Sequence, residues 1–167
     1  MVGGGYVVFD EDDAAELYWD GFFGRPVRVA KPKKGDILSP LRLTHHEVRY
    51  LSERNKLDIF KGKKRIKIPD FKGRARTVYS VYRHLRDNGF VVRSGLKFGA
   101  TFAAYVEGPG IDHAPLLIQT VDINQALTGI EVIRAGRLSH GIKKNFVFSS
   151  LDAQGKPIYA TLSWVRS

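Results

Sequence analysis

The sequence Lys-Phe-Gly-Ala-Thr-Phe-Ala-Ala-Tyr occupies residues 97–105 and is followed by Val-Glu-Gly-Pro-Gly-Ile-Asp and then by His113. From Phe98 to Tyr105, phenylalanine and alanine at every second position give the period of two that is typical of a strand with one face in the core. The Gly-Pro-Gly sequence at 108–110 predicts a tight reversal. We therefore expect one hairpin to bring Tyr105 and His113, two side chains that can transfer protons, to the same edge of a sheet.

The composition indicates a globular, strongly basic protein. A chain of 167 residues, of which 43% are hydrophobic and 11% aromatic, can bury one sizeable core or two small ones. There are 27 lysines and arginines against 17 acidic residues, which gives a net charge of +10. Because neutralising phosphates releases counterions, this charge favours a polyanionic partner such as nucleic acid.

Several protein classes are excluded by what the sequence lacks. Cysteine is absent, so disulfide bonds, thiolate chemistry and cysteine-based zinc sites are excluded. The sequence has no apolar stretch of about 18 residues and no basic amphipathic helix, which argues against a membrane partner. The opening Met-Val-Gly-Gly-Gly lacks the charged and apolar parts of a secretory signal, so we expect a cytoplasmic protein.

The first half of the chain predicts a mixture of short strands and helices. Asp10 is the expected N-cap of the first helix, and the acidic residues that follow it suit the positive end of the helix dipole. Thr44 and Glu47 form a capping box, with Leu43 and Val48 as the hydrophobic staple of a second helix. The expected elements are a strand at 6–9, a helix from 10 to about 21, a strand at 27–30, a helix at 44–55 and a hairpin of 56–60 with 65–68.

A basic loop, Lys-Pro-Lys-Lys-Gly at 31–35, follows the predicted strand at 27–30. Such a loop is usually a solvated connection between elements. The high net charge keeps open the alternative that Lys31, Lys33 and Lys34 contact phosphates.

Two features resemble metal sites, but neither has the spacing of one. His45 and His46 are neighbours, so on a helix they point about 100° apart and do not have the i, i+4 spacing of a shared metal. We interpret them as surface histidines. Asp70-Phe-Lys72 resembles half of the acidic-x-Lys motif of metal-dependent nucleases, but no second carboxylate stands at a matching distance. We therefore expect neither a metal nor another cofactor.

A proline, a glycine and a charge cluster at 69–73 mark the best domain boundary. We expect a small N-terminal α+β domain over 1–72, followed by a mixed β-sheet domain flanked by helices over 73–167. The fold class is thus α+β or α/β.

The second domain is expected to alternate helices and strands. Its first helix ends at Gly89, which suits the left-handed conformation of a helix stop. Thr128 and Glu131 form a second capping box, and the helix after them is expected to bury Ile130, Ile133 and Leu138. The expected elements are a helix at 74–88, a strand at 90–93, the hairpin, a strand to 121, a helix at 128–139 and strands at 145–148 and 157–164.

The proton-transferring residues are of the types that cleave RNA without a metal. A ribose 2′-hydroxyl can attack the adjacent phosphorus when a base takes its proton, an acid protonates the departing 5′-oxygen and a cation stabilises the phosphorane. Tyr105, His113 and the pair Lys143-Lys144 supply groups of these kinds. Each residue alone has a common structural explanation, since tyrosines often end strands and histidines often precede turns.

Three ordered motifs resemble the catalytic domain of archaeal tRNA-splicing endonucleases. They are the stretch 91–105, then His-Ala-Pro at 113–115, then Arg-Leu-Ser-His-Gly-Ile-Lys-Lys at 137–144 before an apolar strand. The preceding Tyr-Arg-His-Leu-Arg-Asp-Asn-Gly at 82–89 also fits this family. The helix and hairpin after residue 43 resemble the family's small N-terminal domain, so the resemblance covers the whole chain.

The resemblance implies a role for each matching residue. Tyr105 matches the general base, His113 the general acid and Lys144 the cation that stabilises the transition state. Arg137 resembles an arginine that stacks on a flipped bulge base, with Arg166 as the possible partner of that stack. The implied reaction cuts precursor tRNA at bulge-helix-bulge junctions, leaves a 2′,3′-cyclic phosphate and a 5′-hydroxyl, and uses no metal.

Two features bear on assembly. In self-sufficient members of the family an acidic turn before the last strand docks on another subunit, whereas here the turn at 152–156 is Asp-Ala-Gln-Gly-Lys, with one acid and one lysine. The last strand carries apolar residues on one face, which suits a subunit contact. These residues are Ile158, Ala160, Leu162 and Trp164.

From these features we expect this chain to be the catalytic subunit of a two-plus-two heterotetramer with a non-catalytic partner. The alternatives are a non-catalytic RNA-binding or structural subunit, and a metal-dependent DNA nuclease, for which the carboxylates are missing.

Overall fold

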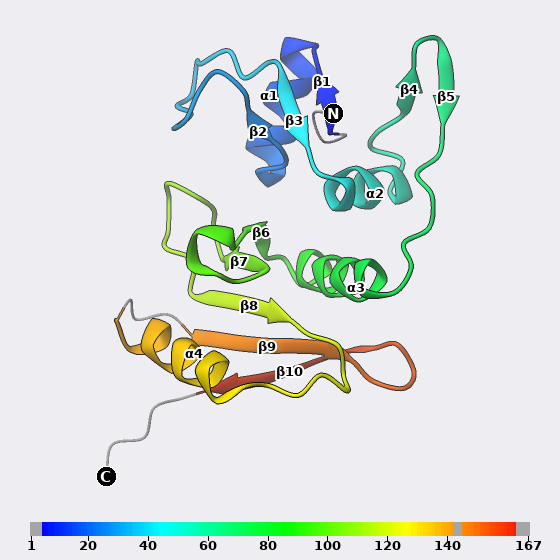
Figure 1. Cartoon of the computed structure of the whole chain (residues 1–167). Helices are drawn as coiled ribbons and strands as arrows, with labels where there is room; N and C mark the ends of the chain where they lie inside the picture. Colours follow the sequence, from blue (N-terminus) through cyan, green and yellow to red (C-terminus); the bar gives the residue numbers. More distant parts are fainter. Residues whose placement is uncertain (1–4, 142–144, 163–167) are drawn as a thin grey trace. The chain divides into compact units, whose positions relative to one another are not determined.

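The computed structural model describes residues 5–141 and 145–162 of the chain (Figure 1). Two compact units make up the chain, Met1–Pro69 and Asp70–Ser167. The division falls after residue 69, whereas the sequence places the boundary after residue 72. None of the described helices is long and apolar enough to cross a membrane.

The first unit contains two helices, a three-stranded antiparallel sheet and a separate hairpin among its described residues. The sheet has the strand order β1-β3-β2, and β4 pairs with β5 in the hairpin. Its elements are β1 (Tyr6–Val8), α1 (Glu11–Gly21), β2 (Arg25–Pro26), β3 (Leu41–Leu43), α2 (His45–Glu53), β4 (Ile59–Lys61) and β5 (Lys64–Ile66).

Both helices of the first unit begin where the sequence predicts. The Asp10 carboxylate accepts a hydrogen bond from the Asp13 N–H at 3.0 Å. The Glu47 carboxylate closes the predicted capping box by accepting from the Thr44 N–H at 2.8 Å. Its other oxygen accepts from the Gly24 N–H, also at 2.8 Å, so one buried carboxylate joins the start of α2 to the segment before β2.

The strand predicted at 27–30 is wrong, because β2 is only Arg25–Pro26. Pro26 pairs with Leu41 of β3, and the Val27 N–H still donates to the Pro40 carbonyl at 3.0 Å. Pro40 has no N–H with which to continue the ladder, so the pairing stops there. Val27 is consequently 55% exposed.

The second unit is a five-stranded mixed sheet with helices, which confirms the predicted α+β architecture. The strand order is β10-β9-β8-β7-β6, in which β8 and β9 are parallel and the other neighbours antiparallel. Its elements are α3 (Arg74–Asp87), β6 (Val91–Ser94), the 3₁₀ turn η1 (Leu96–Phe98), β7 (Phe102–Tyr105), β8 (Leu116–Thr120), α4 (Gly129–Gly141), β9 (Asn145–Leu151) and β10 (Pro157–Leu162).

The strand predicted from Phe98 to Tyr105 begins four residues later than expected. Leu96–Phe98 forms η1, and β7 starts at Phe102. The reason is a tight connection at Gly95, whose N–H donates to the Thr101 carbonyl at 3.2 Å. A Cβ on Gly95 would lie 2.7 Å from the Phe102 backbone, so the close approach requires glycine.

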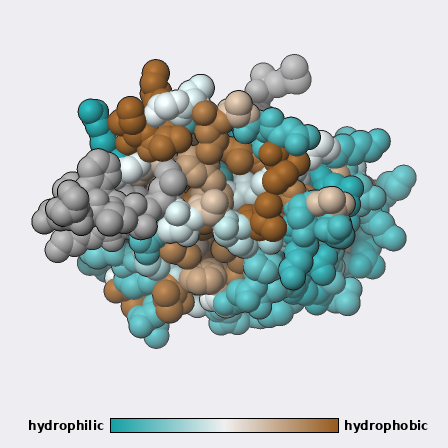
Figure 2. All heavy atoms as spheres, turned by 90° about the horizontal axis from the view of Figure 1, so that it is seen from below, coloured by the Kyte–Doolittle hydropathy of each residue, from teal (hydrophilic) through white to brown (hydrophobic). Residues whose placement is uncertain are grey.

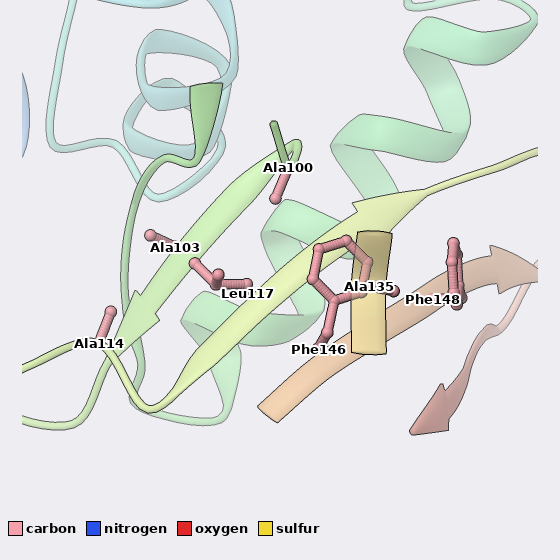
Figure 3. Packing of buried hydrophobic residues seen from close by; sticks show 7 residues of the cluster. All are labelled: Ala100, Ala103, Ala114, Leu117, Ala135, Phe146 and Phe148. Atoms are coloured by element: carbon pink, nitrogen blue, oxygen red, sulfur yellow. The ribbon is translucent and has the colours of Figure 1, made fainter. Parts of the chain in front are cut away.

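Both faces of β7 are buried, rather than one. The Phe102 ring contacts the Tyr82 ring of α3 at a centroid distance of 5.8 Å. On the other face, Ala103 belongs to a buried cluster that includes Ala135 of α4 (Figure 3). Alanines at the facing positions let α4 approach the sheet closely. The cluster consists of Ala100, Ala103, Ala114, Leu117, Ala135, Phe146 and Phe148, with Phe98, Tyr105 and Val121 packed against it.

The predicted capping box of α4 is present, but the predicted inward face is wrong. The Glu131 carboxylate accepts from the Thr128 N–H at 2.7 Å. Ile130 is 79% exposed and Ile133 58% exposed, whereas Ala135 is 1% exposed. The small residue faces the sheet because it permits close packing, and this turns the isoleucines outward. The side chain of Leu138 lies outside the described part of the chain.

Candidate active site

Tyr105 is the last residue of β7, at the edge of the sheet. Its backbone pairs with Val91 of β6. The half-buried side chain packs against the cluster of Figure 3, on the face covered by α4. The ring therefore lies on the face of β7 opposite to that of Phe102 and Ala104.

The loop after Tyr105 is organised by the carboxylate of Asp112. This carboxylate accepts from the N–H groups of Val106 at 3.0 Å, Glu107 at 3.3 Å and Gly108 at 2.8 Å. The Gly108 carbonyl in turn accepts from the N–H groups of Ile111 and Asp112, both at 3.1 Å. Partial burial raises the pKa of Asp112, but the backbone N–H groups of Gly108, Val106 and Glu107 outweigh it and bring the pKa below its ordinary value.

The predicted reversal is confirmed at Gly108 and Gly110, which have φ angles of +147° and +92°. These values lie in the region that favours glycine. Because β7 and β8 are antiparallel, the end of one and the start of the other lie at the same sheet edge.

His113 is exposed and lies between two anchored residues. Asp112 on one side holds the loop, and Ala114 on the other is 1% exposed in the core. Tyr105 and His113 thus stand at the two ends of one hydrogen-bonded connection, with their backbones anchored to the same core.

Lys143 and Lys144 lie outside the described residues. The next residue, Asn145, opens β9 and pairs with Leu116 at the start of β8. Its N–H donates to the Pro115 carbonyl at 2.9 Å. The chain therefore enters β9 at the sheet edge to which His113 belongs.

Sequence comparison assigns both units to one family. A model of the "tRNA intron endonuclease, N-terminal domain" matches residues 1–72, and one of the "tRNA intron endonuclease, catalytic C-terminal domain" matches residues 75–159. The chain belongs to the tRNA intron endonuclease family. Tyr105 and His113 fall within the part that matches the catalytic domain.

Individual relatives agree over nearly the full chain. The tRNA-splicing endonuclease of Hyperthermus butylicus is 38% identical over 96% of this chain and 93% of its own length. That of Saccharolobus solfataricus is 37% identical over 99% and 97%, and that of Pyrobaculum islandicum is 36% identical over 96% and 94%. The chain thus matches nearly the full length of these relatives.

The predicted RNA-binding residues of this family member belong to both units. Arg137 is exposed on α4. Arg166 lies outside the described residues. Lys31, Lys33 and Lys34 are exposed in the first unit. Their loop turns where the Asp36 carboxylate accepts from the Lys33 N–H at 2.8 Å.

The described residues contain no group of three or more His, Asp and Glu side chains that could hold a metal ion. His45 is exposed, and its ring packs edge-on against Tyr6 at 5.2 Å. His46 is partly buried, so of the two histidines only His45 is fully the surface residue that the sequence predicts. Burial lowers the pKa of His46, and the neighbouring charge of His45 lowers it further.

The sequence interpretation missed Asp112. An aspartate that follows a Gly-Pro-Gly reversal is a residue type that commonly accepts backbone N–H bonds in turns. The Gly-Pro-Gly sequence followed by an aspartate could therefore have indicated the role of Asp112 in the loop.

Proposed function

We propose that this family member excises introns from precursor tRNA by attack of a ribose 2′-hydroxyl on the adjacent phosphorus, with no metal in the chemistry. The 2′-oxygen forms a bond to phosphorus, and the bond from phosphorus to the 5′-oxygen of the next nucleotide breaks. The products are a 2′,3′-cyclic phosphate and a 5′-hydroxyl. Family membership supports the substrate, and the placement of Tyr105 and His113 at one sheet edge supports the chemistry.

Two proton transfers accompany the cleavage. Tyr105 takes the proton of the attacking 2′-hydroxyl, and His113 donates a proton to the departing 5′-oxygen. The ammonium group of Lys144 stabilises the negative charge that builds on the phosphorane oxygens. These roles come from the family resemblance. The observation that favours them is the single hydrogen-bonded loop that carries Tyr105 at one end and His113 at the other.

The proposed binding residues make two kinds of contact with the RNA. Arg137 stacks its planar guanidinium on a base of the bulge, with Arg166 as the second side of the stack. Lys31, Lys33 and Lys34 contact phosphates of the RNA. Their exposure in the described part of the chain is consistent with both functions.

The test of the proposed function is cleavage of an intron-containing precursor tRNA in EDTA, with the full chain alone and with its partner subunit. We expect cleavage to persist in EDTA. A single 2′-deoxy substitution at the scissile nucleotide removes the nucleophile and should abolish cleavage. Loss of activity in EDTA, or cleavage of the deoxy substrate, would overturn the mechanism. If the chain does not cleave the precursor even with the partner present, it is a non-catalytic subunit.

We infer further that the enzyme is a two-plus-two heterotetramer with a non-catalytic partner. The only acidic residue of the turn at 152–156 is Asp152. Its Oδ1 accepts from the N–H groups of Gln154 at 2.9 Å and Lys156 at 2.8 Å. A carboxylate that already holds its own turn is a weak ligand for a basic groove on another copy, so a distinct partner is the better fit.

Exposed apolar surface on the second unit supports a subunit contact. Figure 2 shows several groups of apolar residues on the face that is turned to the bottom of Figure 1. Exposed apolar residues of the second unit include Ile123 at 58%, Ile130 at 79%, Ile133 at 58% and Ile158 at 40%. Several large apolar side chains exposed on one unit favour a subunit contact. The side chains of Leu162 and Trp164, which the sequence assigns to the same contact, lie outside the described residues.

A further inference from the structure

The β4–β5 hairpin of the first unit is a basic ribbon. Residues 61–67 are Lys-Gly-Lys-Lys-Arg-Ile-Lys, with five cationic side chains and no acidic one. All five cationic residues are exposed. Asp58, just before the ribbon, forms an ion pair with Arg65. Four lysines remain, none of which the proposed reaction uses.

The hairpin is held firmly at its base. Ile59 and Ile68 are 6% and 8% exposed. The Arg49 guanidinium of α2 donates to the Ile68 carbonyl at 3.3 Å and pairs with Glu53 of the same helix at 2.5 Å. The ribbon therefore presents its lysines from a fixed base, so less conformational entropy is lost when they bind a ligand.

An aromatic ring lies on one face of this ribbon, whereas Lys61 pairs with Lys64 on the other face. Phe60 pairs with Arg65 across the two strands, so their side chains stand on the same face. Phe60 is 60% exposed, although a ring of its size gains free energy from burial. An exposed aromatic ring beside cationic side chains is the combination that binds unpaired nucleotides, because the base stacks on the ring while the cations bind the backbone.

We propose that the β4–β5 hairpin is a second RNA-binding surface of this protein. Phe60 stacks on an unpaired base on one face of the ribbon, and Lys63 in the turn and Lys61 and Lys64 on the other face bind phosphates of the RNA that crosses the ribbon. The occupant is RNA rather than an apolar protein surface, because burying five cations against an apolar partner would strip them of water without compensation. That the RNA is precursor tRNA rests on the proposed function; the surface itself contains none of the proposed catalytic residues.

Stacking is tested by binding of the full chain to a precursor made uncleavable by 2′-deoxy substitution at the cut, measured by fluorescence anisotropy. Phe60→Ala should weaken binding by about 5- to 150-fold, the usual effect of losing one stacked base. Phe60→Leu should lose as much, because leucine is apolar but has no aromatic face, whereas Phe60→Tyr should bind like the wild type. Ile37→Ala, at a residue that is also 60% exposed, is the matched control and should have no effect. Full retention of RNA binding by Phe60→Leu would show that binding needs no aromatic face and would overturn the proposal.

The phosphate contacts are tested through the salt dependence of the same binding. Replacing Lys61, Lys63 and Lys64 by serine should lower the log–log slope of affinity against salt by about 2, since each lost contact to a single strand removes about 0.7. An equal loss of charge elsewhere in the unit provides the control. This control replaces the exposed Arg25, Arg28 and Arg42 by serine. If the two triple variants have equal salt slopes, the hairpin lysines contribute only through the overall charge of the protein, and the proposal is overturned.

The binding experiment separates this proposal from the proposed function, because the deoxy precursor cannot be cut. If the hairpin variants bind it more weakly than the wild type but the wild type fails to cleave the natural precursor with its partner, the catalytic proposal fails and the hairpin proposal stands. If the hairpin variants bind like the wild type while the wild type cleaves, only the hairpin proposal fails. An absence of wild-type binding overturns both.

Discussion

At the scale of single residues, Asp112 is the side chain that sets the geometry between the two proposed proton-transferring groups. Its carboxylate holds three successive backbone N–H groups in the loop between Tyr105 and His113. No other side chain of the described loop accepts hydrogen bonds from its backbone. A change at Asp112 therefore acts on the relative placement of Tyr105 and His113 without touching either residue.

We predict that Asp112→Ala lowers the single-turnover cleavage rate by about 100-fold, the usual cost of displacing a reacting group by about 1 Å. Substrate affinity should change little, because the proposed binding residues lie elsewhere. Asp112→Asn keeps one carbonyl acceptor and should recover part of the rate. Glu107→Ala, in the same loop, is the control and should cleave normally. Equal losses of rate and affinity in Asp112→Ala would indicate unfolding rather than misplacement.

A second prediction concerns His113 itself. His113→Ala should reduce cleavage by about 10²- to 10⁴-fold, the usual contribution of a general acid, with precursor binding nearly intact. His113 is exposed, so its loss should leave the melting temperature unchanged. Cleavage rate, affinity and thermal melting measured on one preparation check all three expectations. Wild-type cleavage by this variant would remove His113 from the mechanism. Lys144→Ala should behave in the same way.

At the scale of elements, local signals in the sequence were sufficient to place the helix starts. Asp10, Thr44 and Thr128 each begin a helix as predicted, because a cap involves only residues up to three positions away. Gly89 stops α3 with a φ of +84° for the same reason.

The predictions that failed depended on distant residues. The strand at 27–30 failed because β3, its partner, is preceded by Pro40. The inward face of α4 was missed because Ala135, rather than the larger Ile130 and Ile133, fits against the sheet. The motif predicts which residues form the site, and that stays a prediction, whereas the bonds of Asp112 depend on a loop conformation that the sequence leaves open.

The sequence allows two interpretations of the basic loop at 31–35, a solvated connection or a phosphate-binding loop. If Lys31, Lys33 and Lys34 contact phosphates, replacing all three by serine should weaken precursor binding. The log–log slope of affinity against salt should then fall by roughly 0.7–0.9 for each lost contact. The triple arginine variant keeps the charge and should bind like the wild type. Measured binding from low to high salt decides the question, and an unchanged slope would make the loop a solvated connection.

At the scale of the whole molecule, the outward isoleucines and the turn at 152–156 have one explanation in common. Ile130 and Ile133 lie exposed on α4, and such exposure is unfavourable in a chain that remains alone. The turn uses its one carboxylate on its own backbone and offers little charge to an identical copy. Both features fit a subunit that is completed by a different protein.

We predict that the chain expressed alone forms a dimer at most and cleaves precursor tRNA poorly, and that a second, catalytically incomplete subunit raises its activity. Light scattering on the separate and mixed subunits gives the masses, and cleavage assays on the same samples give the activity. Replacing both Ile130 and Ile133 by serine should weaken association, because about 25 cal/mol is lost for each Å² of apolar surface no longer buried. Ile37→Ser, at an equally exposed residue of the first unit, should leave association unchanged. A stable, fully active tetramer of this chain alone would refute the distinct partner and leave an assembly of four identical subunits.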